Sequence, residues 1–362
     1  MEYGIVCNRC GHTEGERAFR CSRCNSVLEV KIDYSTVKLG RGFRKSAPRQ
    51  SKYLPFFPIS RLDVRDDEKA TPIAKVMLGG SSAMLKLETE NPTHSFKDRG
   101  SSVEISKAVE LGFRSVCAAS TGNMGISIAR YAHLAGLKAT IFIGRGADRR
   151  KIQMIRMHGA AIRPVDGDFN TSLNLAEKFA RRNRSTMLCG DYHFRKEGQK
   201  SVAFEIMDQL LFHVPDFIFI PVGNATLLSA VHKGLLEYRR FGFIARMPRL
   251  VAVQSKMCDP LIRAFNSGKR IEYMRPKTIA DAIAVGYPTF GAEGLEALSR
   301  TRGIGIAVTE DEISEAVGEL KRLGIKSEPG GAAGVAGLLS MLSSRPRLLS
   351  NKKIVAVVTG SN

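Results

Sequence analysis

The chain has 362 residues, which is enough for two or three domains and a sizeable buried core. Its 43% hydrophobic and 25% charged residues are typical of a globular protein and exclude a disordered one. No apolar run approaches the roughly 18 residues of a membrane span, and residues 1–4 do not begin a secretory signal. We therefore expect a cytoplasmic protein with no membrane attachment.

The net charge is strongly positive, since 55 Lys and Arg stand against 35 Asp and Glu, a formal +20. Such a charge raises the concentration of anions around a protein. The basic residues are scattered in small groups, such as Arg149–Lys151, Arg181–Arg182 and Arg239–Arg240, and Trp is absent. This scatter argues against nucleic acid as the main partner. The charge is compatible with a phosphorylated substrate and equally with a source whose proteins are generally basic.

Four of the seven cysteines form two C-x-x-C pairs near the N-terminus, Cys7 with Cys10 and Cys21 with Cys24. Four thiolates from two tight turns match the tetrahedral ligand set of structural zinc. Two disulfides would need an oxidising compartment, and a redox C-x-x-C needs only one pair. The spacing therefore predicts a zinc ribbon over residues 1–36, whose folding depends on the metal.

Beyond the ribbon, short apolar runs alternate with helical stretches. The apolar runs are the expected strands, and they cover residues 115–119, 139–143, 216–220, 250–253 and 354–358. Runs that are apolar throughout are typical of parallel strands buried on both faces, so the fold class is α/β. We expect residues 38–45 to form a linker and Cys117, Cys189 and Cys258 to lie in the core.

Ligands of an open parallel sheet bind beyond the carboxyl ends of its strands, so we expect the functional residues in the turns there. The first, residues 91–100, reads Asn-Pro-Thr-His-Ser-Phe-Lys-Asp-Arg-Gly and leads into an expected helix. The helix N-terminus and Arg99 would lower the pKa of Lys97 and favour Schiff-base chemistry. Taken alone, Lys97 could equally be a surface lysine.

Three further turns suit an anion. Residues 120–125 and 221–228 each follow an expected strand and open an expected helix, where backbone N–H groups and hydroxyls would face a carboxylate or phosphate. The last turn, residues 358–362, places a hydroxyl and a glycine after the last strand. Together with the lysine, these turns favour a ligand site.

Residues 91–100 match nine of the ten positions of the threonine synthase motif Asn-Pro-Thr-Gly-Ser-Phe-Lys-Asp-Arg-Gly. The chain thus resembles the threonine synthases, which are fold-type II pyridoxal-phosphate enzymes. The resemblance continues over residues 120–123, 165–169, 194–201, 221–224, 278–283, 328–329 and 359–360. It extends to the ribbon, because some threonine synthases carry an N-terminal four-cysteine knuckle.

The resemblance implies how the chain would hold the cofactor. Lys97 would bind pyridoxal phosphate as a Schiff base and, once displaced by substrate, move protons at the substrate's α and β carbons. Asn123 would hydrogen-bond the ring hydroxyl, and the neutral hydroxyl of Thr359 would pair with the ring nitrogen. The cofactor phosphate would lie against the backbone of Gly223, Asn224, Ala225, Thr226 and Leu227.

The resemblance also implies a substrate, the small phosphorylated amino acid O-phosphohomoserine, which would react with water to give threonine and phosphate. Ser120 and Thr121 would hold its α-carboxylate. Arg195, whose planar fork suits phosphate oxygens, would hold its phosphate. Because members of the family are commonly dimers, a homodimer is compatible with the resemblance.

The departures from the family pattern lie around the substrate and leave the cofactor residues intact. His94 replaces a glycine of the motif, where it would pack or contact substrate, and Gly190 stands where a serine contacts the substrate phosphate. Leu227 and Tyr287 each stand where the family often has asparagine. These changes leave open a cysteate synthase using O-phosphoserine and sulfite, or a serine/threonine dehydratase. A non-catalytic homologue is the third alternative, and the intact Lys97 argues against it.

From the resemblance we expect two open twisted α/β sheet domains of the tryptophan synthase β-like architecture after the ribbon. The large cofactor-binding domain would comprise residues 37–90 and 186–362, and a smaller mobile domain residues 91–185. The cofactor would lie in the cleft between them, and the smaller domain would close over the substrate carboxylate.

Overall fold

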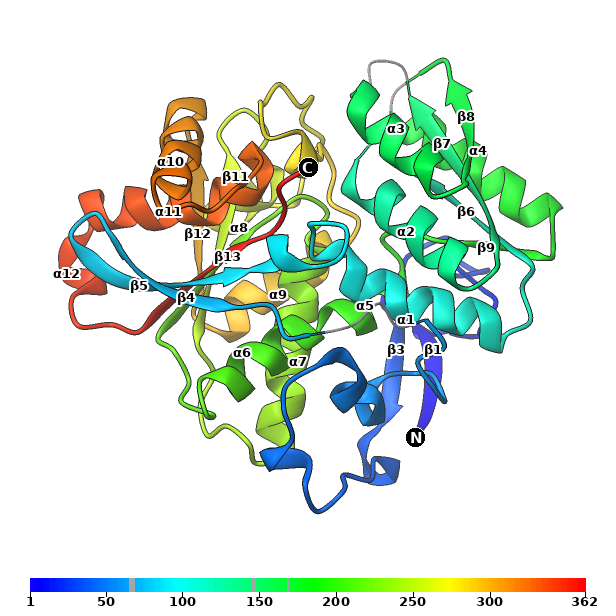
Figure 1. The fold of residues 1–362 in the computed structure, drawn as a ribbon, viewed down its shortest axis with the longest axis horizontal. Coiled ribbons are helices and arrows are strands. Elements are labelled where there is room, and N and C mark those ends of the chain that lie inside the picture. Colours follow the sequence, from blue (N-terminus) through cyan, green and yellow to red (C-terminus); the bar gives the residue numbers. More distant parts are fainter. Residues whose placement is uncertain (65–68, 121, 145–147, 168) are drawn as a thin grey trace. The chain divides into compact units, whose positions relative to one another are not determined.

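The computed structural model describes residues 1–64, 69–120, 122–144, 148–167 and 169–362 (Figure 1). The chain divides into two compact units. The first comprises Met1–Lys69 and Lys97–Ser201, and the second Ala70–Phe96 and Val202–Asn362. The predicted domain boundaries at residues 36, 90 and 185 stay predictions, and so does the mobility of the domain over residues 91–185.

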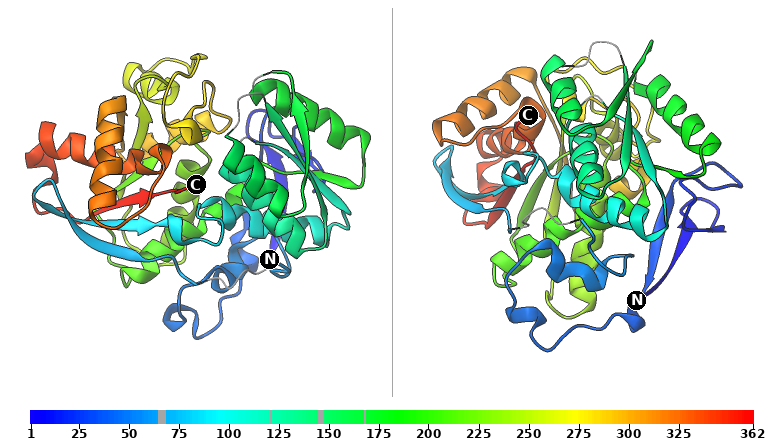
Figure 2. Two further views of the ribbon diagram at one scale, coloured as in Figure 1. Left: turned by 45° about the horizontal axis from the view of Figure 1, so that its top comes forward. Right: turned by 45° about the vertical axis from the view of Figure 1, so that its right-hand side comes forward.

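The N-terminal part of the first unit is an antiparallel sheet in the order β2-β1-β3, drawn in blue in Figure 2. Its strands are β1 (Glu2–Cys7), β2 (Thr13–Glu14) and β3 (Leu28–Asp33). Gly11 and Asn25, the residues that follow the two cysteine pairs, have φ of 70° and 55°. This left-handed backbone, which glycine and asparagine tolerate best, closes both turns, and the predicted ribbon is confirmed as a fold.

The ribbon is fixed to the α/β part of the same unit by the loop between its cysteine pairs. Arg20 Nε lies 2.9 Å from Glu177 Oε1, and the rings of Phe19 and Tyr192 meet edge to face with centroids 5.9 Å apart. The guanidinium of Arg17 lies over the ring of Phe113. Loss of the ribbon's structure would therefore remove contacts from the body of the unit.

The rest of the first unit is built on a parallel sheet in the order β8-β7-β6-β9. In the right-hand view of Figure 2, α4 lies on one side of this sheet and α2 with α3 on the other. The elements are α1 (Lys97–Glu110), β6 (Ser115–Ala119), α2 (Asn123–Leu134), β7 (Lys138–Gly144), α3 (Arg149–Met157), β8 (Ala161–Val165), α4 (Phe169–Arg182), β9 (Thr186–Leu188) and α5 (His193–Gln199).

Two glycines bring helices α1 and α5 into backbone contact. A Cβ at Gly198 would overlap the carbonyl oxygen of Arg99, and a Cβ at Gly100 would lie 2.6 Å from Arg195 Cγ. The amide of Gln50 links α1 to α5 and to the start of α6 (Ser201–Gln209), donating to Arg99 O at 3.0 Å and to Gly198 O at 3.5 Å and accepting from Ser201 Oγ at 2.6 Å. The start of α1 is thereby tied to α5.

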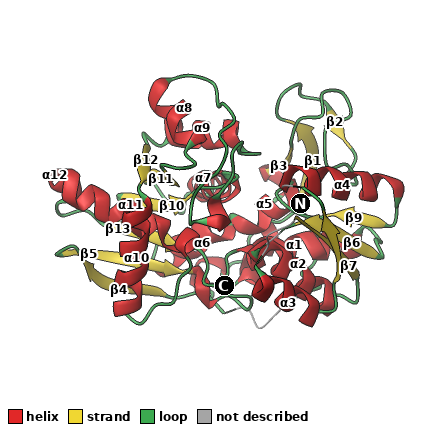
Figure 3. Ribbon diagram, turned by 90° about the horizontal axis from the view of Figure 1, so that it is seen from above, coloured by secondary structure: helices red, strands yellow, loops and turns green. Residues whose placement is uncertain are grey.

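The second unit holds a sheet in the order β12-β11-β10-β13-β5-β4, parallel except for the β4–β5 hairpin. Figure 3 shows α7, α8 and α9 on one side of the strands and α10 and α11 on the other. The elements are β4 (Ile73–Leu78), β5 (Ser81–Leu87), α6 (Ser201–Gln209), β10 (Phe217–Pro221), α7 (Thr226–Arg240), β11 (Arg249–Ser255), α8 (Pro260–Ser267), α9 (Gly291–Arg300), β12 (Ile304–Val308), α10 (Glu310–Arg322), α11 (Pro329–Ser344), α12 (Pro346–Leu349) and β13 (Ile354–Val358). Short 3₁₀ turns cover Tyr34–Thr36, Phe43–Lys45, Gln50–Phe56, Glu88–Glu90 and Asp281–Ile283.

The predicted strands are confirmed to within two residues at each end, as β6, β7, β10, β11 and β13. Every residue of β10 and β13 is buried, as expected of parallel strands covered on both faces. Cys117, Cys189 and Cys258 are buried as predicted. In the predicted linker, Phe43 is buried and packs on Phe56. None of the described helices is long and apolar enough to cross a membrane.

A buried ion pair joins β5 to α6 in the second unit, and it carries a stability prediction. Lys86 Nζ lies 2.6 Å from Glu205 Oε1, and neither side chain is more than 1% exposed. The same ammonium donates to Thr71 O at 2.7 Å and Gln209 Oε1 at 2.8 Å. We expect Lys86→Met to lower the free energy of unfolding by about 3–5 kcal/mol, because it leaves the Glu205 carboxylate buried without its cation.

Urea unfolding followed by circular dichroism measures this loss. The control is the double variant Lys86→Met with Glu205→Gln, which removes both charges and should recover most of the stability. A single variant within about 1 kcal/mol of the wild type would contradict the prediction.

Candidate active site and metal centre

Lys97 is the first residue of α1, as the helix-start motif predicts. Its side chain is 17% exposed, and Nζ lies 3.8 Å from Asp191 Oδ1. Asp191 comes from the segment between β9 and α5, and nothing in the linear sequence brings it to the lysine. The candidate catalytic amine thus has a carboxylate beside it.

Arg195, on α5, is fully buried and turned toward the first turns of α1. One terminal nitrogen donates to Glu104 Oε2 at 2.7 Å and to Ser101 Oγ at 3.0 Å. The other donates to the carbonyl oxygen of Lys97 at 3.1 Å. Nε has no partner among the described residues. Arg195 therefore braces the residue that carries the amine, and its predicted contact with substrate phosphate stays a prediction.

Glu104, which the sequence reading missed, is 1% exposed and accepts from the Gly190 N–H through Oε1 at 2.9 Å. Burial raises the pKa of Glu104, against the smaller lowering effects of Arg195 and of that N–H. Gly190 has a φ of 144°, which favours glycine. The sequence feature that could have identified Glu104 is its spacing from Lys97. It lies seven residues later in α1 and so on the same helix face.

The loop from β6 to α2 has the features of an anion site. Ser120 is buried, and its Oγ accepts from the Gly125 N–H at 2.9 Å. Asn123 is the first residue of α2 and is buried. Lys151, from α3, is buried too, and a Cβ at Gly122 would lie 3.7 Å from its Nζ. A lysine that the sequence reading missed thus lies beside the predicted carboxylate loop.

One of the predicted carboxylate ligands, Thr121, lies outside the described residues. Its role stays a prediction.

In the second unit, the loop from β10 to α7 also suits an anion. Ala225 has a φ of 59° directly before Thr226, the first residue of α7. Such a turn aims successive N–H groups at one point, and the helix N-terminus adds positive potential. A Cβ at Gly223 would lie 3.1 Å from Ile283 Cα, so the loop has little room for a larger residue. These residues fit the phosphate of the predicted cofactor.

Two further side chains of the loop 223–227, Asn224 and Leu227, are fixed by hydrogen bonds or by burial. Asn224 Oδ1 accepts from the Thr289 N–H and hydroxyl at 3.2 and 3.1 Å. Leu227 is buried at the start of α7, whereas Tyr287, the other departure from the family pattern, is 61% exposed. Among the described residues, Tyr287 has no hydrogen bond or ion pair with this loop.

Thr359 follows β13 and is buried. Its N–H donates to Gly331 O at 3.3 Å, and its carbonyl accepts from the Phe96 N–H at 3.0 Å. The candidate ligand of the ring nitrogen is thus bonded to the residue that precedes Lys97. Phe96, Gly331 and Thr359 all belong to the second unit.

His94 has a φ of 56°, the left-handed backbone that glycine adopts at no cost. Its carbonyl accepts from the Ser361 N–H at 3.1 Å, and Nδ1 lies 3.2 Å from Thr89 O. The histidine therefore keeps the backbone shape of the glycine that it replaces. Its predicted packing or substrate contact stays a prediction.

The four N-terminal cysteines form one cluster, with all sulfur atoms within 4.8 Å of one another. Cys7 and Cys24 are 3.4 Å apart and Cys10 and Cys21 3.6 Å, close to the roughly 3.8 Å that four Zn–S bonds of 2.3 Å impose. Burial would raise the pKa of Cys7, but hydrogen bonds from backbone N–H groups and neighbouring thiols hold it at about 6. The pKa values of Cys21 and Cys24 are raised instead, by burial and by the neighbouring thiols, against the lowering effect of backbone N–H groups. The cluster fits a zinc ion.

Comparison with known proteins decides the family. The pyridoxal-phosphate dependent enzyme family matches residues 64–360. The chain belongs to this family. It is 34% identical to the threonine synthase of Methanosarcina acetivorans, over 99% of this chain and 91% of that protein. It is also 34% identical to the threonine synthase of Methanocaldococcus jannaschii, over 98% and 91%. The resemblance read from the motifs is confirmed, and the alternative enzyme with another donor is not favoured.

Solved structures of this family share the fold. Maize serine racemase superposes with a TM-score of 0.71 at 24% identity, covering 81% of this chain and 88% of that one. A fungal L-serine ammonia-lyase from Rhizomucor miehei gives 0.72 at 22%, covering 81% and 94%. The predicted fold-type II architecture is confirmed.

Proposed function

We propose that this member of the pyridoxal-phosphate family is a threonine synthase, which converts O-phosphohomoserine and water to threonine and phosphate. The observation that carries the proposal is the motif 91–100, with Lys97 as the first residue of α1, in a chain related to threonine synthases over almost its whole length. The expected cytoplasmic location and homodimeric state belong to the same proposal and rest on the resemblance.

Within this proposal, pyridoxal phosphate supplies an electron sink for the bond broken at the substrate's α carbon. Lys97 binds the cofactor and afterwards, as acid and base, moves protons at the α and β carbons. Asp191, 3.8 Å away, attracts the ammonium form of Lys97 and so steadies it at the site. Ser120 and Thr121 hold the α-carboxylate at the N-terminus of α2, and the cation of Lys151 favours that carboxylate.

From the resemblance, we assign Lys97, Asn123, the loop 223–227 and Thr359 to the cofactor. We assign the loop to the phosphate because its glycine, its left-handed Ala225 and the start of α7 suit an anion. We assign Thr359 to the ring nitrogen and Arg195 to the substrate phosphate from the resemblance.

We propose further that Cys7, Cys10, Cys21 and Cys24 hold a structural zinc ion. The sulfur positions support this assignment, as does the C-x-x-C spacing. With four protein ligands the ion has no open position, so its part is to stabilise the ribbon and not to react.

Phosphate release by the purified holoenzyme tests the activity. O-Phosphohomoserine and O-phosphoserine, the latter with and without sulfite, are supplied in parallel, and the amino-acid products are identified by mass spectrometry. We expect threonine and phosphate in equal amounts from O-phosphohomoserine and no turnover of O-phosphoserine. Turnover of O-phosphoserine, or no phosphate from either compound, would contradict the proposed reaction.

A further inference from the structure

A cavity of about 420 Å³ lies in the first unit, where the ribbon meets the α/β part. Residues 16–19 of the ribbon form one wall, and the segment 180–194 contributes most of the other. Figure 3 shows the ribbon strands next to α4, with which that segment begins. The volume falls in the range of small-molecule sites, about 300–1,000 Å³. None of the described residues assigned to the cofactor, the substrate or the zinc ion lines this cavity.

The interior of the cavity is apolar and rich in aromatic rings. Phe113, Leu188 and Phe194 line it, and each is at most 8% exposed. The rings of Phe19 and Tyr192, which also line it, meet edge to face. Rings in such positions pack well against a further ring, through their edges or their faces. The cavity therefore suits a ligand with a ring in its apolar part.

The acidic residues that line the cavity are neutralised by cations of the chain itself. Glu16 Oε1 lies 2.8 Å from Lys107 Nζ, and Glu104 Oε2 lies 2.7 Å from Arg195 Nη2. Neither of these cations is part of the lining. The two carboxylates therefore do not offset the charge of the basic residues around the cavity.

Three arginines with exposed side chains line the cavity, namely Arg17, Arg181 and Arg184. Within the part of the chain that the structure describes, none of them forms an ion pair with a carboxylate. Being exposed, they lie where the cavity meets solvent. Their uncompensated charge makes this entrance attractive to an anion.

Arg181 is the arginine best placed to bind that anion. Its guanidinium lies over the ring of Phe19, 4.6 Å from the centroid, so the ring orients the guanidinium and leaves its N–H edges open. Arg17 uses its terminal nitrogens on the carbonyl oxygens of Leu111 and Arg184. Arg181 makes no hydrogen bond to any residue in the described ranges.

We propose that this cavity is a binding site for a small aromatic carboxylate, with the ring inside the cavity and the carboxylate on Arg181. A guanidinium meets a carboxylate through two parallel N–H donors, which suits a monoanion at the entrance of an apolar space. A cationic ligand would be repelled by the three arginines. The inference is independent of the proposed function, because it uses none of the residues assigned to the reaction.

Calorimetry on the full-length holoenzyme tests this inference with 3-phenylpropionate as the probe. Two comparison compounds separate the features of the probe: 3-phenylpropanamide keeps the ring without the charge, and acetate keeps the carboxylate without the ring. We expect each of them to bind at least about tenfold more weakly than 3-phenylpropionate, because one loses a charge-assisted hydrogen bond and the other the burial of a ring.

Arg181→Ala should weaken the binding of 3-phenylpropionate at least about tenfold, since it removes the charged donor. The matched control is Arg182→Ala. Arg182 is the next residue of α4 and is exposed as well, but it does not line the cavity, so this variant should bind the probe as the wild type does. Ala18→Leu, which places a larger side chain on the ribbon wall, should weaken the binding of the acid and the amide alike.

Equal affinities for 3-phenylpropionate and its amide would overturn the inference, because the arginines would then play no part in recognition. Failure of 3-phenylpropionate to bind, or binding of acetate with the same affinity, would also overturn it. An Arg181→Ala variant that binds the probe as tightly as the wild type would place the probe elsewhere in the protein. The same loss of affinity in Arg182→Ala would attribute binding to the general positive charge and would equally contradict a site at Arg181.

Discussion

Replacing Lys97 with alanine should lower kcat for phosphate release by at least about 10³-fold, within the range that a positioned acid–base group contributes. The residue is assigned both to bind the cofactor and to move protons at two carbons, so its loss removes two functions at once. The fold should persist, because the Lys97 side chain is partly exposed and the brace from Arg195 is made to its backbone carbonyl. Circular dichroism and stopped assays of the holoenzyme measure both results.

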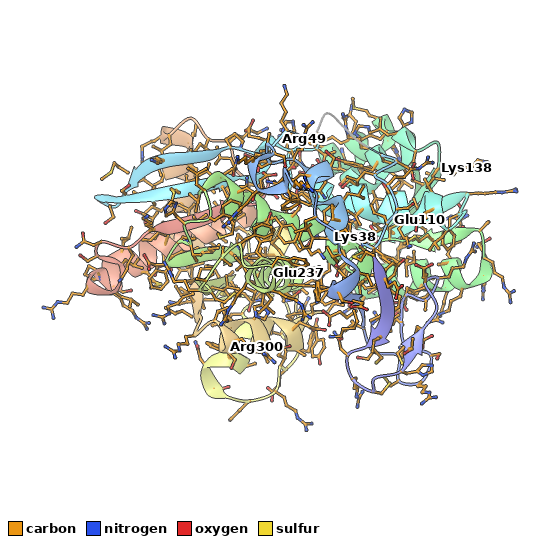
Figure 4. The ribbon with its side chains drawn as sticks, turned by 90° about the horizontal axis from the view of Figure 1, so that it is seen from below. Lys38, Arg49, Glu110, Lys138, Glu237 and Arg300 are labelled. Atoms are coloured by element: carbon orange, nitrogen blue, oxygen red, sulfur yellow. The ribbon has the colours of Figure 1, made fainter. Side chains whose placement is uncertain are left out.

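Two control variants show whether activity needs the amine of Lys97 itself. One keeps the positive charge at position 97, and the other removes a lysine elsewhere. Lys97→Arg keeps a cation beside Asp191 but has no amine that can be deprotonated near neutral pH, so it should be as inactive as alanine. Lys138→Ala, at an exposed site on β7, should be fully active (Figure 4). Borohydride should fix the cofactor to the wild type and not to Lys97→Ala. A Lys97→Ala variant with more than a few per cent of the activity would remove Lys97 from the mechanism.

The sequence sufficed for the parts of the molecule in which neighbours in the chain decide the outcome. A parallel strand such as β10 is apolar along its whole length, so its position can be read residue by residue. The cysteine pairs and the helix start at Lys97 are equally local. The family motif added roles for residues that fold into the turns after β6, β10 and β13.

What the sequence could not supply is the set of charges that other elements bring to these turns. Asp191 reaches Lys97 from the segment before α5, and Lys151 reaches the Gly122 loop from α3. Glu104 meets Arg195 only because two glycines let α1 and α5 touch. Such contacts depend on how helices pack, and a pattern along one strand or turn does not encode them. Arg195 shows the consequence, since the motif suggests a free phosphate ligand and the structure gives a paired one.

Removing zinc should unfold the ribbon and leave the α/β sheets folded. Metal binding contributes on the order of 10 kcal/mol to folding in small zinc domains, and the ribbon has few buried apolar residues to replace it. We therefore expect a chelator, or Cys21→Ser, to release one zinc ion per chain. The contacts of Arg20 with Glu177 and of Phe19 with Tyr192 would be lost with the ribbon, so the unfolding midpoint of the first unit should fall as well.

Thiol titration gives a direct readout of this local unfolding. In the chelated protein Cys7, Cys10, Cys21 and Cys24 should react rapidly, whereas the buried Cys117, Cys189 and Cys258 should stay protected as long as the sheets are folded. Cys258→Ser is the control, since it removes a buried thiol and should retain the metal. Reaction of all seven thiols at one rate would mean that the ribbon and the sheets unfold together. Retention of the metal by Cys21→Ser would show that the ribbon holds it without a full set of thiolates, against the four-cysteine site.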